Sequence, residues 1–419
     1  MPQMDGENTY LPRSLEPSLI TAMSDTPVVC LLGPRQCGKS TLAANLDPKR
    51  AYFSFDDQNL LNAAKSDPEG FVAQLPEWVT IDEVQRVPEL LLAIKRNVDS
   101  NRKAGRYLLT GSANLLQMPR LADSLAGRME CIYLHPFTES EKEKSPGMFL
   151  KEWLGGSLET QLSTSTAPAP SSLPKRLTTG GYPEPNRRAP TRARVWHRQY
   201  IRSIIERDIH DVAQVKEGQD VARVLELLAY RTAKLLNVSR VASDLKLDRD
   251  TVERYLTILE KVFLVRRIPA WHRNSAKRLI RTPKIYLRDS GLISTLNDLK
   301  SEDWNTRKDE FGHVLESFVG QELIAQAGWT DPDLLFLHYR DKDQVEVDFV
   351  IVKGKKVWGV EVKAAATVSA SDGKGLRRLA AQSGRDFQEG IVLYDGNSVL
   401  QISNHPKIYA VPLTRLWEL

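Results

Sequence analysis

The stretch from Val28 to Leu42 reads VVCLLGPRQCGKSTL, and it decides the fold of the N-terminal part of the chain. Its apolar start predicts a short buried strand, and a turn bounded by Gly33 and Gly38 leads into a helix that begins near Lys39. The spacing matches G-x-x-x-x-G-K-[ST] without a mismatch, in the strand-to-helix context that this motif needs. Because the backbone N–H groups of such a turn point inward and the helix adds its positive dipole end, the turn suits a phosphate group.

We therefore predict a nucleotide-binding phosphate loop. Lys39 is expected to reach the β- and γ-phosphates, and Ser40 is expected to ligate Mg²⁺. An ordinary glycine turn followed by Lys-Ser is the alternative, which the complete match disfavours. The residues expected to hold the nucleotide are Gly33, Pro34, Arg35, Gln36, Cys37, Gly38, Lys39, Ser40 and Thr41.

A second apolar run, EWVTIDEVQ at residues 77–85, ends in two acids. Its pattern predicts a buried parallel strand whose carboxyl end faces the ligand-binding edge of the sheet. Asp82 would hold Mg²⁺ through water, and Glu83 would polarise the water that attacks the γ-phosphate. A plain helix N-terminus fits the same two acids, and the phosphate loop upstream is what favours the catalytic interpretation.

Further strands are expected at residues 51–57 (AYFSFDD), 106–112 (RYLLTGS) and 129–137 (MECIYLHPF). Because they alternate with helices, they predict a parallel sheet with helices on both faces. The strand expected at residues 106–112 ends in small polar residues, and Ser112 or Thr110 would contact the γ-phosphate from there.

Arg128 directly precedes the last of these strands. We expect it at a strand edge next to the site, where its guanidinium could reach a neighbouring subunit's nucleotide as an arginine finger. A surface ion pair between Arg128 and Glu130 is the alternative, and the two interpretations carry equal weight.

Several stretches, taken in order, resemble the bacterial and archaeal AAA-plus ATPases whose C-terminal region is catalogued as a domain of unknown function. They are GPRQCGKSTL, WVTIDEVQRVPELL, YLLTGSANLL, SLAGRMECIYLHPF, GGYPEP, YLTILEKVFLV, KIYLRDSGL, HVLESFVGQEL and EVDFVI…GVEVK. The phosphate loop is shared by many families, but this combination and order are specific and cover nearly the whole chain. The resemblance implies an enzyme that hydrolyses ATP with Mg²⁺, forms a homo-oligomer such as a hexameric ring, and carries a winged-helix segment and a nuclease-like fold.

The chain has 419 residues, of which 41% are hydrophobic and 26% are charged, so two or three domains are expected. No apolar stretch approaches the length of a membrane span, and residues 1–10 show no basic-then-apolar leader, so we predict a cytoplasmic protein without a membrane partner. Three cysteines without paired spacing argue against a zinc site or a disulfide framework.

We predict an α/β fold class with four segments. Residues 1–140 would form the AAA-plus domain with its parallel sheet, and residues 141–185 a lid remnant with a flexible linker that includes the Ser-, Thr-, Ala- and Pro-rich stretch 157–174. Residues 186–300 would form a helical, basic winged-helix domain. Residues 301–419 would form an α/β restriction-endonuclease-like domain.

Residues 186–290 contain 24 Lys and Arg against 12 Asp and Glu, a net charge of +12 where the whole chain carries only +5. Lys261 to Arg288 holds nine basic residues and no acid, with Trp271 and His272 among them. Such a basic stripe is typical of a nucleic-acid surface, so DNA is the expected partner. The alternative is that this region packs against the ATPase core, and that the stripe binds acidic neighbours or phosphate backbone without sequence preference.

The same region carries a helix-turn-helix pattern. Ser239 is predicted to cap the first helix and Asp248 the second, RDTVERYLTILEKV, with FLVRRIPAW and KIYLRD as the wing. The outward positions of the second helix would be Arg249, Thr251, Arg254 and Tyr255. In such proteins this helix enters the major groove. The predicted DNA-binding residues are Arg249, Arg254, Arg273, Lys277, Arg278 and Arg281.

The last domain is expected to open with a helix over residues 310–328 and to continue with two strands joined at Gly354. Alternate strand residues share a face, so Glu361 and Lys363 point to one side, and Asp348 on the neighbouring strand can lie beside them. This pattern, with Glu316 on the preceding helix, resembles the active site of the PD-(D/E)xK nucleases.

In that resemblance Asp348, Glu361 and Glu316 would hold Mg²⁺, and Lys363 would orient the attacking water. An inert binding fold is an equally weighted alternative. For the whole chain we predict an ATPase that acts on DNA, against a competing hypothesis of a nucleotide-switched regulatory or scaffold protein.

Overall fold

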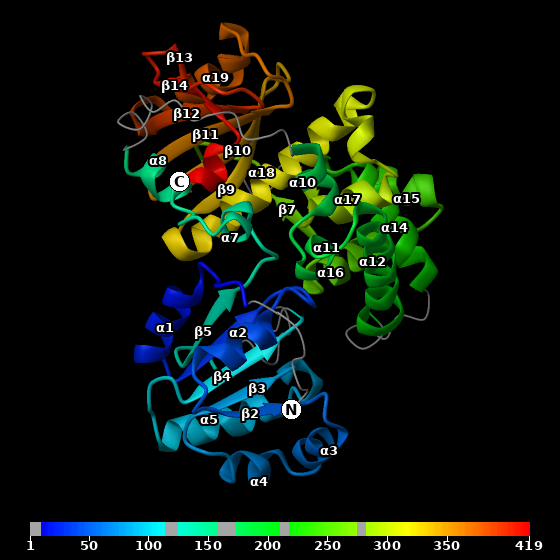
Figure 1. Cartoon of the computed structure of the whole chain (residues 1–419), viewed down its shortest axis with the longest axis vertical. Coiled ribbons are helices and arrows are strands. Elements are labelled where there is room, and N and C mark those ends of the chain that lie inside the picture. The colour runs from blue at the N-terminus through cyan, green and yellow to red at the C-terminus, as the bar shows by residue number, and fades with distance from the viewer. Residues whose placement is uncertain (1–9, 114–124, 157–172, 210–217, 275–281) are drawn as a thin grey trace.

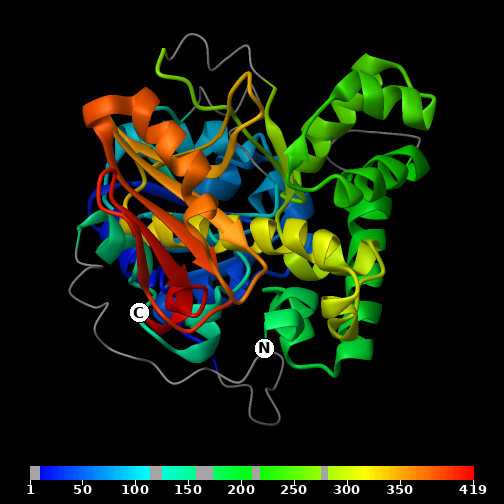
Figure 2. The same ribbon diagram turned by 90° about the horizontal axis from the view of Figure 1, so that it is seen from above.

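The computed structural model describes residues 10–113, 125–156, 173–209, 218–274 and 282–419. Figure 1 shows three bodies: an N-terminal sheet with its helices in blue and cyan, a largely helical region in green, and a C-terminal sheet in orange and red. The long yellow helix α18 (Lys308–Thr330) lies between the last two, as the view from above in Figure 2 also shows. Within the described ranges, every helix is too short or too polar to cross a membrane.

The N-terminal sheet is parallel, in the order β2-β3-β4-β1-β5. Its strands are β1 (Val28–Leu32), β2 (Ala51–Ser54), β3 (Val79–Asp82), β4 (Tyr107–Gly111) and β5 (Met129–Tyr133). Its helices are α1 (Glu16–Asp25), α2 (Lys39–Leu46), α3 (Gln58–Ser66), α4 (Pro68–Ala73) and α5 (Leu90–Ser100). The predicted parallel sheet is thus confirmed.

Both faces of this sheet are buried. Val28 and Leu32 of β1 pack in one apolar cluster with residues of α3, α4 and α5, whereas Val29 and Leu31 pack in another with residues of α1 and α2. This alternation follows from the period of two along a strand, and it explains why β1 is apolar throughout. The carboxyl ends of β1, β3 and β4 consequently meet at one edge of the sheet.

The middle of the chain is mainly helical. Its helices are α7 (Glu139–Glu143), α8 (Phe149–Leu154), α10 (Leu173–Thr179), α11 (Pro183–Asn186), α12 (Pro190–Ser203), α14 (Gly218–Tyr230), α15 (Val238–Leu245), α16 (Arg249–Lys261) and α17 (Ser290–Leu296). A three-stranded antiparallel sheet accompanies them in the order β6-β8-β7, with β6 (Lys234–Leu235), β7 (Val265–Ile268) and β8 (Lys284–Leu287). Residues 157–172 of the expected linker lie outside the described ranges.

Helix caps in this region test two sequence predictions. Asp248 caps α16, accepting the backbone N–H of Thr251 as predicted. The cap of α15 is Asn237, whose side chain accepts the N–H of Arg240, so the prediction of Ser239 as cap is wrong. Asn and Ser are equivalent as caps, and the helix begins one residue before Ser239.

The C-terminal sheet has six strands in the order β13-β14-β12-β11-β10-β9 and mixes parallel with antiparallel pairs. They are β9 (Leu335–Arg340), β10 (Glu346–Lys353), β11 (Lys356–Lys363), β12 (Phe387–Tyr394), β13 (Leu400–Ser403) and β14 (Ile408–Pro412), with helices α19 (Lys374–Ser383) and α20 (Arg415–Glu418). Helix α18 packs tightly on this sheet, because a Cβ at Gly320 would lie 2.5 Å from the ring of Phe349.

One apolar core joins the helical region to the C-terminal sheet. It includes Phe149 of α8, Tyr255 of α16, Phe318 of α18 and Ile391 of β12. The N-terminal sheet has its own two clusters on either face. The chain therefore folds around a five-stranded parallel sheet at one end and a larger shared core at the other.

Candidate functional site

The phosphate loop follows β1 and is held by backbone contacts that only glycine permits. A Cβ at Gly33 would lie 2.1 Å from the carbonyl oxygen of Leu134, and Gly38 has a φ of 104°. The side chain of Lys39 is buried, and its Nζ donates to the carbonyl of Pro34 at 2.8 Å. The ammonium group is thus held over the loop itself, where an anion would sit.

Ser40 and Asp82 meet at the carboxyl edge of the sheet, as the sequence predicts. Ser40 is the second residue of α2, and its Oγ donates to the Asp82 carboxylate at 3.0 and 3.1 Å. Thr110 of β4 donates to the same carboxylate, and Ser54 of β2 does so at 3.3 Å. Three neutral hydroxyls therefore orient Asp82 without cancelling its negative charge.

Glu83 follows directly, in the left-handed backbone region at φ 59°. Its carboxylate accepts the hydroxyl of Ser112 at 2.9 Å and the side-chain amide of Gln85. Gln85 also donates to the Ser112 hydroxyl at 2.9 Å. Ser112 thus contacts the predicted base directly. Sequence reasoning missed Gln85, although its place two residues after Glu83 was the available signal.

Two further residues reach the phosphate loop from other parts of the chain. Arg13 donates to the carbonyl of Cys37 at 2.9 Å and to the Glu141 carboxylate at 3.0 Å. Tyr200 of α12 donates its hydroxyl to the carbonyl of Arg35 at 3.1 Å. Tyr200 was missed because no local pattern in the sequence links α12 to the loop.

Arg128 does not lie beside the nucleotide site of its own chain. Its neighbour Met129 pairs with Val28 at the start of β1, whereas the phosphate loop follows Leu32 at the other end. The guanidinium of Arg128 pairs with Asp99 and donates to the carbonyl of Ala126. The prediction of a place next to the site is therefore wrong, because β5 is parallel to β1. Contact with a neighbouring subunit's nucleotide stays a prediction.

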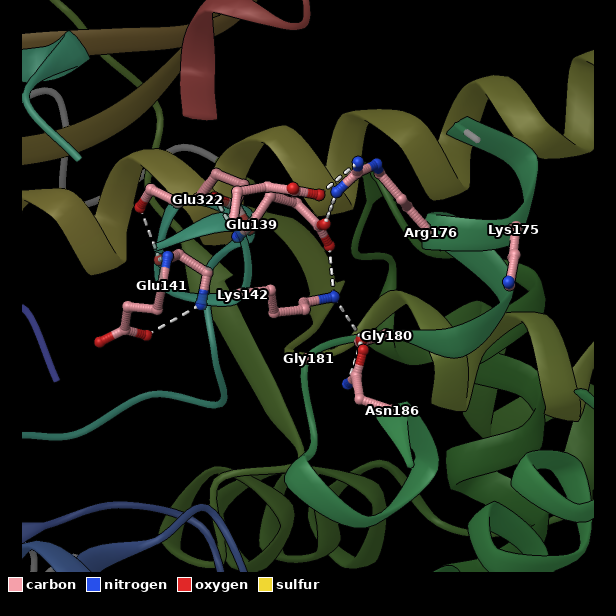
Figure 3. A network of polar contacts seen from close by, with 12 residues as sticks. Glu139, Glu141, Lys142, Lys175, Arg176, Gly180, Gly181, Asn186 and Glu322 are labelled. Carbon is pink, nitrogen blue, oxygen red and sulfur yellow. Dashed lines mark hydrogen bonds and ion pairs between the residues drawn. The ribbon is translucent and has the colours of Figure 1, made fainter. Parts of the chain in front are cut away.

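A polar network joins the end of the ATPase sheet to the rest of the chain (Figure 3). Glu139 of α7 accepts from Lys142 and from Arg176 of α10, and its backbone N–H donates to the Glu322 carboxylate of α18 at 3.1 Å. Burial, followed by the charge of Glu139, raises the pKa of Glu322 well above its usual range. Helix α7 is thus fixed from two sides.

Two basic residues of the stripe are paired with acids inside the protein. Arg267 pairs with Glu253 and Glu260, and Lys284 is buried among acids described below. Trp271 is buried as well, in an apolar cluster of the C-terminal sheet. For these residues the prediction of a nucleic-acid surface is wrong, since the acids that balance them come from elsewhere in the chain.

The predicted DNA-contacting residues divide into three groups. Arg249 and Arg254 are exposed on α16, and Arg273 is exposed after β7. Tyr255 is fully buried, so its predicted outward position is wrong; it follows Val252 at helical spacing on the inner face. The remaining predicted contacts, Lys277, Arg278 and Arg281, lie outside the described residues.

The C-terminal acids come together as predicted, but around a lysine. Lys284 of β8 places its Nζ 2.9 Å from the Glu316 carboxylate and 3.4 Å from that of Asp348, with Glu346 at 3.6 Å. Tyr286 donates to Glu316 as well. Burial, followed by the charge of Asp348, raises the pKa of Glu316 to about 7. Burial alone would lower the pKa of Lys284, but the surrounding acids outweigh this effect and raise it.

This arrangement does not fit the predicted metal site. The backbone N–H of Val362 donates to Asp348 at 2.9 Å, and burial raises the pKa of Glu361 well above its usual range. Lys363 is half-exposed, 3.9 Å from Asp372. Across the described residues, no group of three or more His, Cys, Asp or Glu could hold a metal ion. The prediction of Mg²⁺ on Asp348, Glu361 and Glu316 fails because the Lys284 ammonium fills the space between the acids.

Family models match the chain in three consecutive segments. Residues 25–142 match an AAA domain, residues 171–303 a "Domain of unknown function (DUF8612)" and residues 311–416 a "Domain of unknown function (DUF4143)". Among curated proteins, uncharacterized protein Rv2008c of Mycobacterium tuberculosis and uncharacterized protein Mb2031c of Mycobacterium bovis are each 29% identical over 351 residues, which is 84% of this chain and 73% of theirs.

Solved structures give weak overall superpositions. The Walker-type ATPase PABY2304 of Pyrococcus abyssi is 15% identical with a TM-score of 0.40, covering 70% of this chain and 97% of that one. The RuvB Holliday junction branch migration motor of Thermotoga maritima is 19% identical with a TM-score of 0.27, covering 61% and 87%. At these scores the likeness says nothing about function or assembly. Residues 25–142 thus combine a match to an AAA domain with a phosphate loop, and two regions that match domains of unknown function follow.

Proposed function

We propose that the protein hydrolyses ATP at the edge of the N-terminal sheet. The observation that carries this proposal is the convergence of Ser40, Asp82 and Glu83 on one edge, next to the phosphate loop. Nucleotide binding needs the phosphate loop, whereas hydrolysis also needs residues that hold Mg²⁺ and orient the attacking water. The chain has candidates for both tasks. Phosphoryl transfer depends mainly on positioning and charge stabilisation, which these groups can supply.

Each residue has a definite task in this proposal. Lys39 and the loop N–H groups would bind the β- and γ-phosphates, with Arg13 fixing the loop from behind through the Cys37 carbonyl. Ser40 and Asp82 would hold Mg²⁺, which offsets negative charge on the phosphates when bound. Glu83 would accept a proton from the attacking water, kept in place by Ser112 and Gln85.

We also propose that the outer face of α16 contacts DNA. Arg249 and Arg254 are exposed there, on the third helix of a helix-strand-helix-helix-strand-strand order that suits a winged helix. Their contacts would be to phosphates, because guanidinium groups pair readily with phosphate oxygens. Assembly into a homo-oligomer, with Arg128 reaching a neighbouring subunit, is part of the same proposal.

A nucleotide-switched regulatory protein is the second candidate, and one observation favours it. Arg13 touches the phosphate loop and Glu141 of α7, while Glu139 of the same helix contacts Glu322 of α18. A change at the loop therefore has a physical route to the C-terminal half of the chain.

Phosphate release and nucleotide binding, measured with and without duplex DNA, test these proposals. Lys39→Ala should abolish nucleotide binding, whereas Glu83→Gln should keep binding and lose turnover by roughly 10²- to 10⁴-fold, since only the base is removed. Near-normal turnover of Glu83→Gln would contradict the assignment of the base. DNA binding that weakens with salt, together with faster phosphate release in the presence of DNA, would favour the enzyme that acts on DNA. Phosphate release that does not respond to DNA would favour the nucleotide-switched regulatory protein.

A further inference from the structure

A cavity of about 810 Å³ lies where three parts of the molecule meet. Helix α1 and strand β5 form one side, β7 and the residue Arg288 directly after β8 a second, and the end of α18 a third. We call it the junction cavity and define it by six of its lining residues: Ser18, Tyr133, Phe263, Arg266, Arg288 and Trp329. No residue of the phosphate loop from Gly33 to Thr41 lines it, so it is separate from the nucleotide site.

Two neighbouring arginines of β7 have opposite environments. The guanidinium of Arg267 is neutralised by Glu253 and Glu260. Arg266 points into the junction cavity, and within the described part of the chain no carboxylate pairs with it. Burial, followed by repulsion from Arg288, lowers the pKa of Arg266 well below its usual range. The protein thus keeps a costly positive charge on the cavity wall.

Arg288 adds a second positive charge to the same wall. Its guanidinium lies 4.9 Å from the centroid of the Phe263 ring and 3.4 Å from Nδ1 of His135. Burial lowers the pKa of Arg288 to about 10, so this side chain is still charged at neutral pH. Burial and the nearby arginines lower the pKa of His135, which therefore stays neutral and adds no charge.

The acids around the junction cavity do not balance these two arginines. Glu260 pairs with Arg267, and Asp331 pairs with Lys353. The other two acids of the wall, Asp25 and Glu130, are exposed. The part of the wall formed by Arg266 and Arg288 is therefore positively charged. The acids of the wall are either paired or exposed, so they offset little of this charge.

We propose that the junction cavity binds a small phosphate-bearing molecule of about nucleotide size. Guanidinium groups bind phosphate oxygens in pairs, and binding would supply the missing counter-charge to Arg266 and Arg288. The rings of Phe263, Tyr133 and Trp329 offer apolar surface for the rest of the ligand. The volume lies in the usual range of small-molecule sites. Because all three parts of the molecule line the cavity, its occupancy would be linked to how they pack.

The test uses the full chain and inorganic pyrophosphate as probe, with sodium chloride at matched ionic strength. Lys39→Ala serves as background, so that the phosphate loop does not contribute. We expect pyrophosphate to raise the melting temperature in this background. Adding Arg266→Gln should weaken pyrophosphate binding by roughly 10- to 100-fold in calorimetry, since a charge-assisted contact is lost.

Arg267→Gln is the matched control, one residue away on the same strand. Without ligand, Arg266→Gln should leave the melting temperature unchanged or raise it, because an uncompensated charge disappears, whereas Arg267→Gln should lower it. Arg267→Gln should nevertheless keep the pyrophosphate response. The proposal is overturned if Lys39→Ala already removes that response, if sodium chloride reproduces it, if both arginine variants lose it equally, or if duplex DNA alone elicits it.

Discussion

The molecule contains two clusters of acids that differ in what lies among them. At the ATPase site, Asp82 and Glu83 are surrounded by neutral donors, the hydroxyls of Ser40 and Ser112 among them. In the C-terminal domain, the ammonium of Lys284 occupies the centre of the cluster. Neutral donors orient a carboxylate and leave its charge available, whereas an ammonium cancels it. The first cluster can therefore accept a cation, and the second already has one.

The sharpest test replaces one acid from each cluster. Asp82→Asn should lower ATP hydrolysis roughly 100-fold or more, because several kcal/mol of charge stabilisation depend on the ion that it would hold. Asp348→Asn should leave hydrolysis unchanged and lower the melting temperature. Steady-state phosphate release and thermal melts measure the two effects. Equal losses of hydrolysis in both variants would mean that the clusters do not act separately.

A second test removes the internal cation. Lys284→Ala should lower the free energy of unfolding by about 3 to 5 kcal/mol, because it leaves buried acids without a counter-charge. Mn²⁺ should then stabilise the variant and not the wild type, since the space between Glu316 and Asp348 is vacated. Chemical denaturation with and without Mn²⁺ provides the measurement. Lys363→Ala is the control and should have little effect; a wild type that Mn²⁺ stabilises equally would contradict the comparison.

The third prediction concerns pH. The pKa of Glu316 is raised to about 7 from the ordinary 4.5, so the folded protein binds this proton more tightly than the unfolded chain. The resulting stability is complete below about pH 4.5 and is lost as the pH rises towards 7. As the pH rises through 7, the wild type should therefore lose up to about 3 kcal/mol of unfolding free energy relative to Glu316→Gln, and the difference should level off about one pH unit above 7. A difference that is constant from pH 4.5 to 7 would refute the raised pKa.

The smallest effect is expected on the outer face of α16, where charge is exposed rather than enclosed. Arg254→Ala should reduce the slope of log binding constant against log salt concentration by about one, if this arginine contacts a DNA phosphate. Arg223→Ala on α14 is the control, because that guanidinium already bonds to Asp220. DNA binding titrated at several salt concentrations gives the slopes, and an unchanged slope for Arg254→Ala would place α16 away from DNA.

Much of the ATPase site could be predicted because its determinants are local. A strand, a glycine turn and a helix place Lys39 and Ser40, and the carboxyl end of a parallel strand places Asp82. Arg128 could have been placed correctly too, since a residue that precedes a parallel strand lies at the edge opposite the phosphate loop. The burial of Tyr255 could also have been predicted, because Tyr255 lies three residues after the buried Val252 and therefore on the same face of the helix.

Other features could not be predicted from local patterns. Lys284 belongs to a run of basic residues, and only the packing of β8 against α18 brings it to Glu316, 32 residues later in the chain. Arg266 and Arg267 are identical in type and adjacent, yet among the described residues only Arg267 has a carboxylate partner. The charge pattern of a sequence does not show which side chains become buried. Basic residues in such a stripe can therefore pair with acids of the same chain as well as bind a partner.

The position of α7 also limits which segments of this protein can be exchanged with those of a relative. Its Glu141 binds Arg13, which precedes the segment matched by the AAA domain, and the N–H of Glu139 binds Glu322, far beyond it. A chimera that exchanged only residues 25–142 for those of a relative without an acid at position 141 would leave the buried guanidinium of Arg13 without its carboxylate partner. A working hybrid would therefore either keep an acid at position 141 or exchange Arg13 together with residues 25–142.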